Sequence, residues 1–266
     1  MASLIFRLVL LFAPVVAVAD AGNAQMGSFL ARYSELQTRR VETDEGNAYV
    51  TRDIAKGATL DLAELAIQAE TIEVGGAAPP RVAPDEYEEL MILKSGELAV
   101  SVGNRDWGIL GPGSVVVSGP GEQRTFENVG ELPVTYYLFT YRSRQLADSR
   151  REAQAGGPIV VDWNTVDYVP SDIGGRRQMF DRPTAMFENF EMHASTLNEG
   201  LTNHPAHTHR AEEFVLIIDG EVQMRVGDKT IQAQAGDLIY LQSMVPHSLD
   251  NVGKGSTTYF AFQYQP

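Results

Sequence analysis

An internal repeat constrains the fold of this 266-residue chain more than any other feature. Glu89 and Gly96 recur as Glu213 and Gly220, a displacement of 124 residues. The same displacement, or one residue less, relates further pairs: Val102 and Val226, Gly113 and Gly236, Asn128 and Asn251, Tyr141 and Tyr264. A repeat that keeps its register in this way indicates duplication of one domain. We therefore expect two domains of the same fold.

The repeated unit has the pattern of β-structure. Short apolar runs, such as residues 65–67 and 90–93, alternate with Gly and Pro turns, which is typical of an all-β sandwich or barrel. Residues 142–157 are charged and end in two glycines, so we expect a linker there, partly helical, with the domain boundary between residues 150 and 151. Residues 26–39 carry apolar side chains at helical spacing and predict a short N-terminal helix.

Residues 1–19 are interpreted as a targeting segment rather than part of the fold. Arg7 precedes an apolar run, and Ala17-Val18-Ala19 has the form of a secretory cleavage site. The run is too short for a comfortable membrane span, although a retained N-terminal anchor is the rival interpretation. We expect cleavage before Asp20 and a periplasmic or secreted protein. The domains would then be the signal peptide (1–19), an N-terminal barrel (20–150) and a C-terminal barrel (151–266).

Composition excludes several classes of function. The formal net charge of −14 argues against a nucleic-acid partner or an anionic membrane surface. The chain contains no cysteine, which removes thiol catalysis, disulfides and Cys-ligated zinc. The expected partner is a small-molecule substrate or ligand, and both a monomer and a homo-oligomer are compatible with the sequence.

Four of the five histidines lie between residues 204 and 247. His207 and His209 are two residues apart, so in a strand both imidazoles face the same way. Glu213 has the same parity, and His247 follows on a later strand. Three imidazoles and one carboxylate from neighbouring strands make a first-row transition-metal site with water positions left open. Glu212 has the opposite parity and is expected to face solvent.

These residues also match a known pattern. Gly200, His207-x-His209, Glu213 and Gly220 closely match the first signature motif of the cupin superfamily, and Gly236, Pro246-His247 and Asn251 match the second. The chain thus resembles a cupin. Together with the repeat, it resembles a bicupin of two tandem double-stranded β-helix (jelly-roll) barrels. The resemblance implies that His207, His209, Glu213 and His247 bind one divalent transition metal, and Mn, Fe, Ni or Zn would suit this set.

The repeat register predicts a different content for the first barrel. A guanidinium has no lone pair free for a metal, so we expect a metal-free first barrel in which Arg124 pairs with Glu89. The counterparts of His207, His209, Glu213 and His247 are Ala83, Asp85, Glu89 and Arg124.

Two residues are candidates for catalysis beside the metal. His193 shares strand parity with Glu191 and Ser195 and could act as a general acid or base near neutral pH. A hydrogen-bonded or exposed histidine is an equal alternative. Arg176 could fork onto a substrate carboxylate, against the alternative of a surface or domain-interface arginine. Further candidates near the metal are Arg177, Gln178, His204, Gln223, Arg225, Tyr240 and Gln242.

The cupin fold does not determine the chemistry. Among two-domain members, the chain resembles the ureidoglycine aminohydrolase-type bicupins, which pair a metal-free N-terminal barrel with a metal-bearing C-terminal one. Its ligand order departs from theirs, which is Glu-x-His, three residues, His, with a glutamine last. Oxalate-decarboxylase-like bicupins, which keep ligands in both barrels, differ at the first domain. We expect an exported metalloenzyme for a small polar or carboxylate-bearing metabolite, of aminohydrolase, isomerase/lyase or dioxygenase type. The alternative is a non-catalytic module that binds or senses a small molecule or sugar.

Overall fold

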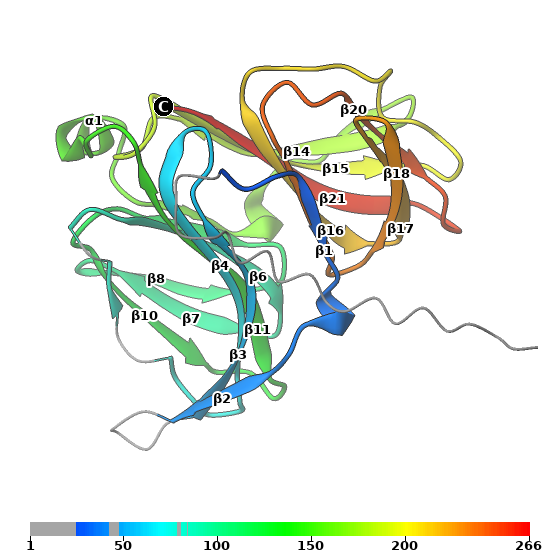
Figure 1. The fold of residues 1–266 in the computed structure, drawn as a ribbon. Helices are drawn as coiled ribbons and strands as arrows, with labels where there is room; N and C mark the ends of the chain where they lie inside the picture. The colour runs from blue at the N-terminus through cyan, green and yellow to red at the C-terminus, as the bar shows by residue number, and fades with distance from the viewer. Residues whose placement is uncertain (1–24, 43–47, 79–80, 84) are drawn as a thin grey trace, which may run out of the picture.

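The computed structural model describes residues 25–42, 48–78, 81–83 and 85–266 (Figure 1). The expected signal peptide, residues 1–19, lies outside them. In the described part of the chain, no helix has the length and apolarity needed to cross a membrane.

The described residues form two β-barrels, each closed by one large and one small antiparallel sheet (Figure 1). The first barrel contains β2 (Arg39–Glu42), β3 (Ala48–Gly57), β4 (Leu62–Ile72), β5 (Arg81–Val82), β6 (Glu88–Ser95), β7 (Leu98–Val102), β8 (Arg105–Leu110), β9 (Val115–Ser118), β10 (Gln123–Asn128), β11 (Val134–Ser143) and β12 (Ile159–Val161). The second contains β1 (Phe29–Ala31), β13 (Val169–Ser171), β14 (Gly174–Arg182), β15 (Asn189–Leu197), β16 (Glu212–Asp219), β17 (Glu221–Val226), β18 (Lys229–Gln234), β19 (Leu238–Leu241), β20 (His247–Asn251) and β21 (Thr257–Gln265). The predicted all-β fold of two tandem barrels is confirmed.

Repeat-related strands lie in the same order in the two barrels, and the small sheet of the first barrel has one additional strand, β5. The large sheets run β12-β9-β6-β11-β4-β3-β2 and β1-β19-β16-β21-β15-β14-β13, and the small sheets run β5-β10-β7-β8 and β18-β17-β20. Arg124 on β10 pairs with Val102, just as His247 on β20 pairs with Val226. Asn128 and Asn251 each accept a hydrogen bond of 3.0 Å from the amide two residues on. The sequence repeat is therefore a structural duplication.

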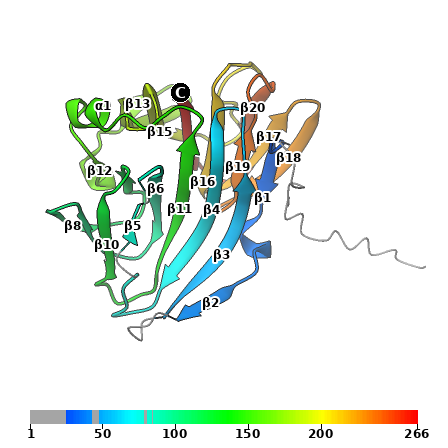
Figure 2. The same ribbon diagram turned by 60° about the vertical axis from the view of Figure 1, so that its left-hand side comes forward.

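The expected N-terminal helix is wrong. Residues 29–31 form β1, a single 3-10 turn covers Tyr33–Glu35, and β2 follows. β1 pairs with the edge of β19 in the second barrel (Figure 2), where the ring of Phe29 lies 5.6 Å from that of Tyr240. Pairing and burial on this edge outweigh the local helical spacing, as tertiary context commonly does.

Strand pairing also crosses the predicted domain boundary. β12, which follows residue 151, pairs with β9 of the first barrel, and β1 pairs with the second. Between β11 and β12 the linker contains the short helix α1 (Ser149–Gln154), whose first amides are capped by the Asp148 carboxylate. The boundary between residues 150 and 151 stays a prediction.

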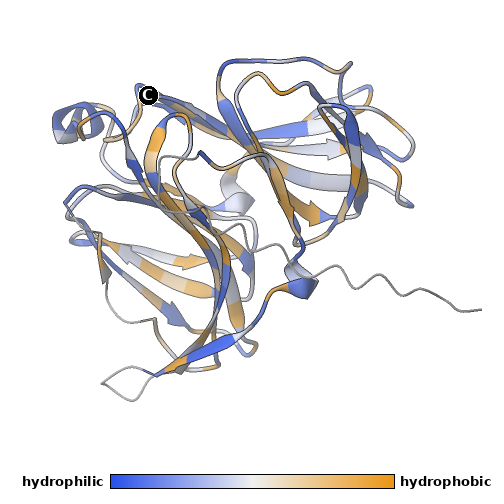
Figure 3. Cartoon of the chain, viewed as in Figure 1, coloured by the Kyte–Doolittle hydropathy of each residue, from blue (hydrophilic) through white to orange (hydrophobic). Residues whose placement is uncertain are grey.

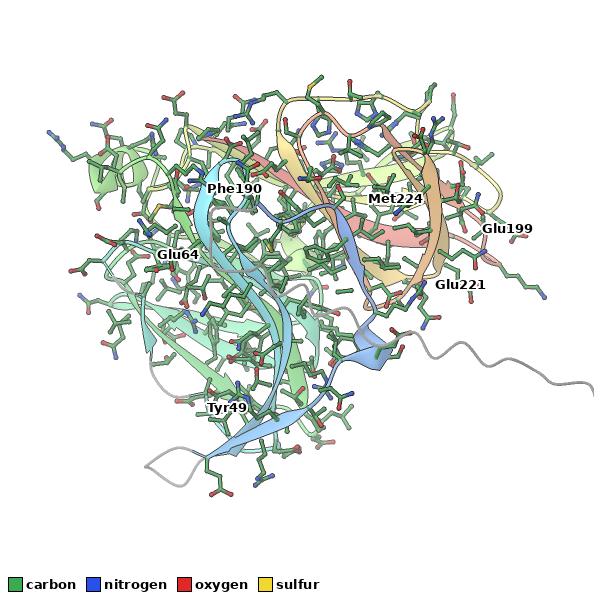
Figure 4. The ribbon with its side chains drawn as sticks, viewed as in Figure 1. Tyr49, Glu64, Phe190, Glu199, Glu221 and Met224 are labelled. Carbon is green, nitrogen blue, oxygen red and sulfur yellow. The ribbon has the colours of Figure 1, made fainter. Side chains whose placement is uncertain are left out.

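The two large sheets pack against each other through aromatic side chains. The ring of Phe139 on β11 lies 5.5 Å from that of Phe214 on β16 and 5.3 Å from that of Phe262 on β21, both edge to face. Apolar residues, orange in Figure 3, lie along the strands of both barrels. Phe190, labelled in Figure 4, belongs to the same apolar cluster.

Two carboxylates are buried in this interface, and one corrects a prediction. Glu212 was expected to face solvent, but only 1% of it is exposed. It accepts hydrogen bonds from the Thr59 hydroxyl at 2.6 Å and the Leu60 amide at 2.9 Å, both in the first barrel. The strand parity was right, since Glu212 points away from Glu213. In the folded protein, the first barrel rather than water lies against that face of the second barrel.

Glu88, the repeat counterpart of Glu212, makes the equivalent contacts from the first barrel to the second. It accepts from the Tyr141 hydroxyl at 2.6 Å and from the Ala185 amide of the second barrel at 3.1 Å. Burial raises the pKa of Glu88 to about 7. Each barrel thus holds one interface carboxylate that receives backbone amides from the other barrel.

Candidate metal centre

The four predicted ligands converge at one end of the second barrel. His207 and His247 form an antiparallel bridge, with their backbone groups hydrogen-bonded at 3.0 and 3.1 Å. Glu213 stands on β16, and His247 begins β20. The loop before His247 closes onto the His209 carbonyl through the amide of Met244, which has a positive φ of 64°. A non-glycine residue in this conformation costs energy, so the packing around the site must hold the loop there.

The side chains approach closely. One nitrogen from each of His207, His209 and His247 lies within 4.8 Å of the others. Glu213 Oε2 lies 2.9 Å from His209 Nε2 and 3.3 Å from His247 Nε2. The structure thus brings together all four residues that the motif predicted.

Backbone carbonyls decide which ring nitrogens face this centre. His209 Nδ1 lies 2.9 Å from the Ala211 carbonyl, and His247 Nδ1 lies 2.8 Å from the Val245 carbonyl. A carbonyl only accepts hydrogen bonds, so each Nδ1 carries the proton and each neutral ring turns a bare Nε2 lone pair toward Glu213. Carbonyls that accept a hydrogen bond from the far ring nitrogen orient metal-binding histidines in this way.

That geometry leaves lone pairs facing lone pairs. In the neutral ring, His247 Nε2 is buried without a hydrogen-bond partner, and Glu213 Oε2, 3.3 Å away, also carries only lone pairs. A cation between them resolves the repulsion and uses every one of these groups as a ligand. The residues therefore fit a divalent transition metal.

The close approach of these side chains also shifts their pKa values. Burial raises the pKa of Glu213, but the hydrogen bonds that His209 and His247 donate when their rings are protonated outweigh it and hold it at about 2. The hydrogen bond to Glu213 raises the pKa of His209. Burial, followed by the neighbouring histidines, lowers the pKa of His207. The carboxylate is thus ionised and His207 neutral near pH 7, the states that metal ligands need.

A cavity of about 490 Å³ opens beside this cluster. Its walls come from residues of β13, β14, β15, β16, β17, β20 and β21, including Met224, which the side-chain view labels in the second barrel (Figure 4). Arg176 and His193 both line it. They share a partner, since Glu191 Oε1 lies 2.7 Å from Arg176 Nη2 and 2.8 Å from His193 Nδ1. The catalytic roles of Arg176 and His193 stay predictions.

Of the other candidates, only His204 is among the residues that line the cavity. His204 lines the cavity, with its ring 4.2 Å from that of His207. Arg177 instead lies over the Trp163 and Tyr168 rings, and the Tyr240 hydroxyl donates to Glu212 in the interface. Gln178 donates to Glu191 at 3.0 Å. Gln223, Arg225 and Gln242 are not among the residues that line the cavity.

Sequence reasoning missed one residue at the centre of the cavity wall, Glu191. The sequence showed that Glu191 faces the same way as His193. It gave no local sign that the carboxylate accepts hydrogen bonds from three side chains. It also missed Tyr259, whose hydroxyl accepts from Asn203 Nδ2 at 3.3 Å. The inward parity of β21 could have indicated Tyr259.

In the first barrel, the predicted pairing of Arg124 with Glu89 is confirmed. Arg124 Nε donates to Glu89 Oε2 at 2.5 Å, and Thr140 donates to Oε1 at 3.1 Å. Both members of the pair are buried, with side-chain exposures of 2% and 6%. A protonated guanidinium thus occupies the position that corresponds to His247.

Comparisons with known proteins agree with this architecture. Residues 195–262 match the family model of the cupin domain. The oxalate decarboxylase of Lactobacillus farciminis, solved as a formate complex, superposes with a TM-score of 0.67 at 14% identity, covering 93% of this chain and 88% of that one. A mutant of the Bacillus subtilis oxalate decarboxylase gives 0.66 at 15% identity, over 92% and 79% of the two chains. AerE from Microcystis aeruginosa gives 0.63 at 12% identity, over 87% and 98%.

At these identities the likeness shows the fold alone, and no curated protein matches the chain by sequence. The fold and the matched domain define the class: residues 195–262 form a cupin domain, and the chain has the two-barrel fold of a bicupin. The more specific likeness to ureidoglycine aminohydrolase-type bicupins stays a prediction.

Proposed function

We propose that the second barrel binds one divalent transition metal through His207, His209, Glu213 and His247, and that the protein is a metalloenzyme for a small carboxylate-bearing metabolite. The observation that carries the proposal is the convergence of bare lone pairs. His209 Nε2 and His247 Nε2 face Glu213 Oε2 at 2.9 and 3.3 Å, and both protons are committed to backbone carbonyls. A metal ion between these nitrogens and the carboxylate would use all of these lone pairs.

The metal would supply Lewis-acid stabilisation of charge that develops on a substrate oxygen. The chain's own residues would do the rest. Arg176, whose side chain is 49% exposed, would bind a substrate carboxylate through the guanidinium nitrogens that Glu191 leaves free. His193 would accept or return a proton within the cavity. The volume of about 490 Å³ suits a small molecule rather than a polymer.

The fold neighbours make manganese the first metal to test. The Bacillus subtilis oxalate decarboxylase has Mn(II) centres, and imidazole with carboxylate is a suitable donor set for Mn²⁺. Because the likeness is one of fold, it selects only the first metal to test. The proposal of a metal centre and of a carboxylate-bearing substrate rests on the donor set and the cavity.

Elemental analysis tests the metal centre. The mature chain, purified without chelator, is compared with His207→Ala and His247→Ala, and with His204→Gln as a matched control. We expect about one equivalent of metal in the wild type and in His204→Gln, and loss in the other two variants. The same metal content in all four proteins would refute the ligand set. No metal in any of them would leave the non-catalytic binding module as the better reading.

Turnover separates an enzyme from a binding module once the metal is known. Small acids and amides are screened with the metal-loaded protein, with oxygen uptake recorded if the metal is iron. Binding of a ligand without turnover would contradict the catalytic part of the proposal. Export is part of the proposal too, and the N-terminal sequence of the secreted protein should begin at Asp20.

A further inference from the structure

One carboxylate oxygen organises the polar wall of the cavity opposite the metal ligands. Glu191 Oε1 lies 2.8 Å from His193 Nδ1, 2.7 Å from Arg176 Nη2 and 3.0 Å from Gln178 Nε2. Arg176 and Gln178 can only donate through these nitrogens. The side chain of Glu191 is 12% exposed, so water competes little for this oxygen.

The contact determines the tautomer of His193. Burial by itself raises the pKa of Glu191, but the hydrogen bonds from His193 and Gln178 and the charge of Arg176 outweigh burial and lower it. The carboxylate therefore stays ionised and can only accept hydrogen bonds. A ring nitrogen 2.8 Å from an accepting oxygen must carry the proton. Neutral His193 is therefore protonated on Nδ1, and its Nε2 keeps a free lone pair.

The sheet register sets this nitrogen across the cavity from the metal ligands. His193 on β15 pairs with Ala261 on β21, which pairs with Val215 on β16. In the next row, Glu191 and Glu213 flank Gln263. Because β21 lies between β15 and β16, the backbones of these two strands are two strand spacings, about 10 Å, apart. This distance leaves room for a small molecule between the imidazole and the metal ligands.

The floor of this gap is a small residue. Ala261 corresponds to Leu138 in the first barrel, which is buried in that barrel's core. Ala261 lines the cavity of the second barrel. The missing side-chain volume lies directly between His193 and the strand that carries Glu213.

We propose that Glu191 is a positioning residue that holds His193 in the Nδ1–H form, so that Nε2 faces the cavity as a hydrogen-bond acceptor and proton acceptor. Resting on the proposed function, this specifies the substrate class: a small acid or amide that also carries a hydroxyl or N–H donor. The proton passes from that donor to Nε2, and the resulting imidazolium is balanced by the Glu191 carboxylate. No oxidant or reductant takes part in this step.

Nitrogen-15 NMR of the imidazole reads the tautomer directly, without any turnover. The full mature chain, labelled on histidine, is measured in the Zn²⁺-loaded and chelator-treated forms at about pH 8.5, above the ordinary range of imidazole titration. His193→Gln assigns the signals. We expect protonated Nδ1 and unprotonated Nε2 for His193 in the wild type. In Glu191→Ala the ratio of the Nδ1–H to the Nε2–H form should fall at least about tenfold.

Asp181→Asn is the matched control, because Asp181 lies on the same hairpin and accepts from Asn189 at 2.9 Å outside the cavity. It should leave the His193 signals unchanged. A wild-type spectrum with the proton on Nε2, or one that Glu191→Ala does not alter, would overturn the proposal. Absence of bound metal would count against the proposed function alone, since the tautomer is also read in the chelator-treated form.

Discussion

Replacement of Glu212 by alanine should weaken the union of the two barrels. Glu212 accepts from the Thr59 hydroxyl and the Leu60 and Asp61 amides of the first barrel, at 2.6, 2.9 and 3.2 Å. Within its own barrel it accepts from the Tyr264 hydroxyl at 2.9 Å and from Tyr240. Alanine would leave all of these donors in a dry interface without their acceptor.

The magnitude follows from the number of donors left unpaired. Each buried donor without a partner costs about 1–3 kcal/mol, so five independent losses would be comparable to the whole stability of a typical domain, about 5–15 kcal/mol. Release of the carboxylate's own desolvation penalty, and rearrangement of the hydroxyls, offset much of this. With this offset, we expect Glu212→Ala to cost about 3–5 kcal/mol, equivalent to leaving two or three donors unpaired. Thr59→Val, which removes one donor, should cost about 1 kcal/mol.

Urea unfolding measures both effects. Of the two tryptophans, Trp107 lies on β8 of the first barrel and Trp163 packs against Phe260 of the second at 5.9 Å, so fluorescence follows both barrels. Since the two groups share one network, the double variant should lose little more than Glu212→Ala alone. Glu221→Ala, at an exposed position of β17, is the control and should stay within about 0.5 kcal/mol of the wild type. A loss below about 1 kcal/mol for Glu212→Ala, or full additivity with Thr59→Val, would refute the reasoning.

Three further predictions concern other buried groups. Burial raises the pKa of Glu88 to about 7 from an ordinary 4.5, so its contribution to stability is complete below pH 4.5 and is lost as the pH rises through 7. At about 1.4 kcal/mol per pH unit this amounts to about 3 kcal/mol, and Glu88→Gln should remove that decline from urea midpoints measured against pH. Arg124→Leu should destabilise the chain by about 3–5 kcal/mol in the same urea assay, because Glu89 is left buried without its partner, and a second change, Glu89→Leu, should recover most of the loss. Ala261→Leu should fill the cavity floor, leaving metal content unchanged while substrate or ligand affinity falls at least about tenfold, as calorimetry would measure.

Each of these has its own contrary result. Parallel pH profiles for the wild type and Glu88→Gln would show that Glu88 is not the titrating group. A double variant as unstable as Arg124→Leu would mean that packing volume, not the unpaired charge, causes the loss. Loss of metal from Ala261→Leu would mean that the change distorts the ligand set rather than filling the cavity.

The duplication and the candidate ligand set were readable from the chain because they depend on local spacing. Register repeats across 124 residues whether or not the barrels are seen, and strand periodicity places His207, His209 and Glu213 on one face. The pairing of Arg124 with Glu89 followed from the same register. Composition and spacing thus determined the all-β class, the two barrels and the metal-binding end of the second.

What covers each face was decided only by the tertiary structure. Parity showed that Glu212 points away from Glu213, but not that another barrel, rather than water, lies on that side. The helical spacing of residues 26–39 was real, yet the open edge of β19 offered more burial and hydrogen bonding than a lone short helix. The contacts of Glu191 with Arg176 and His193 likewise join two strands whose register depends on a bulge after Gln178. Local sequence sets where a side chain points along its own strand, and the packing of distant segments sets what that side chain meets.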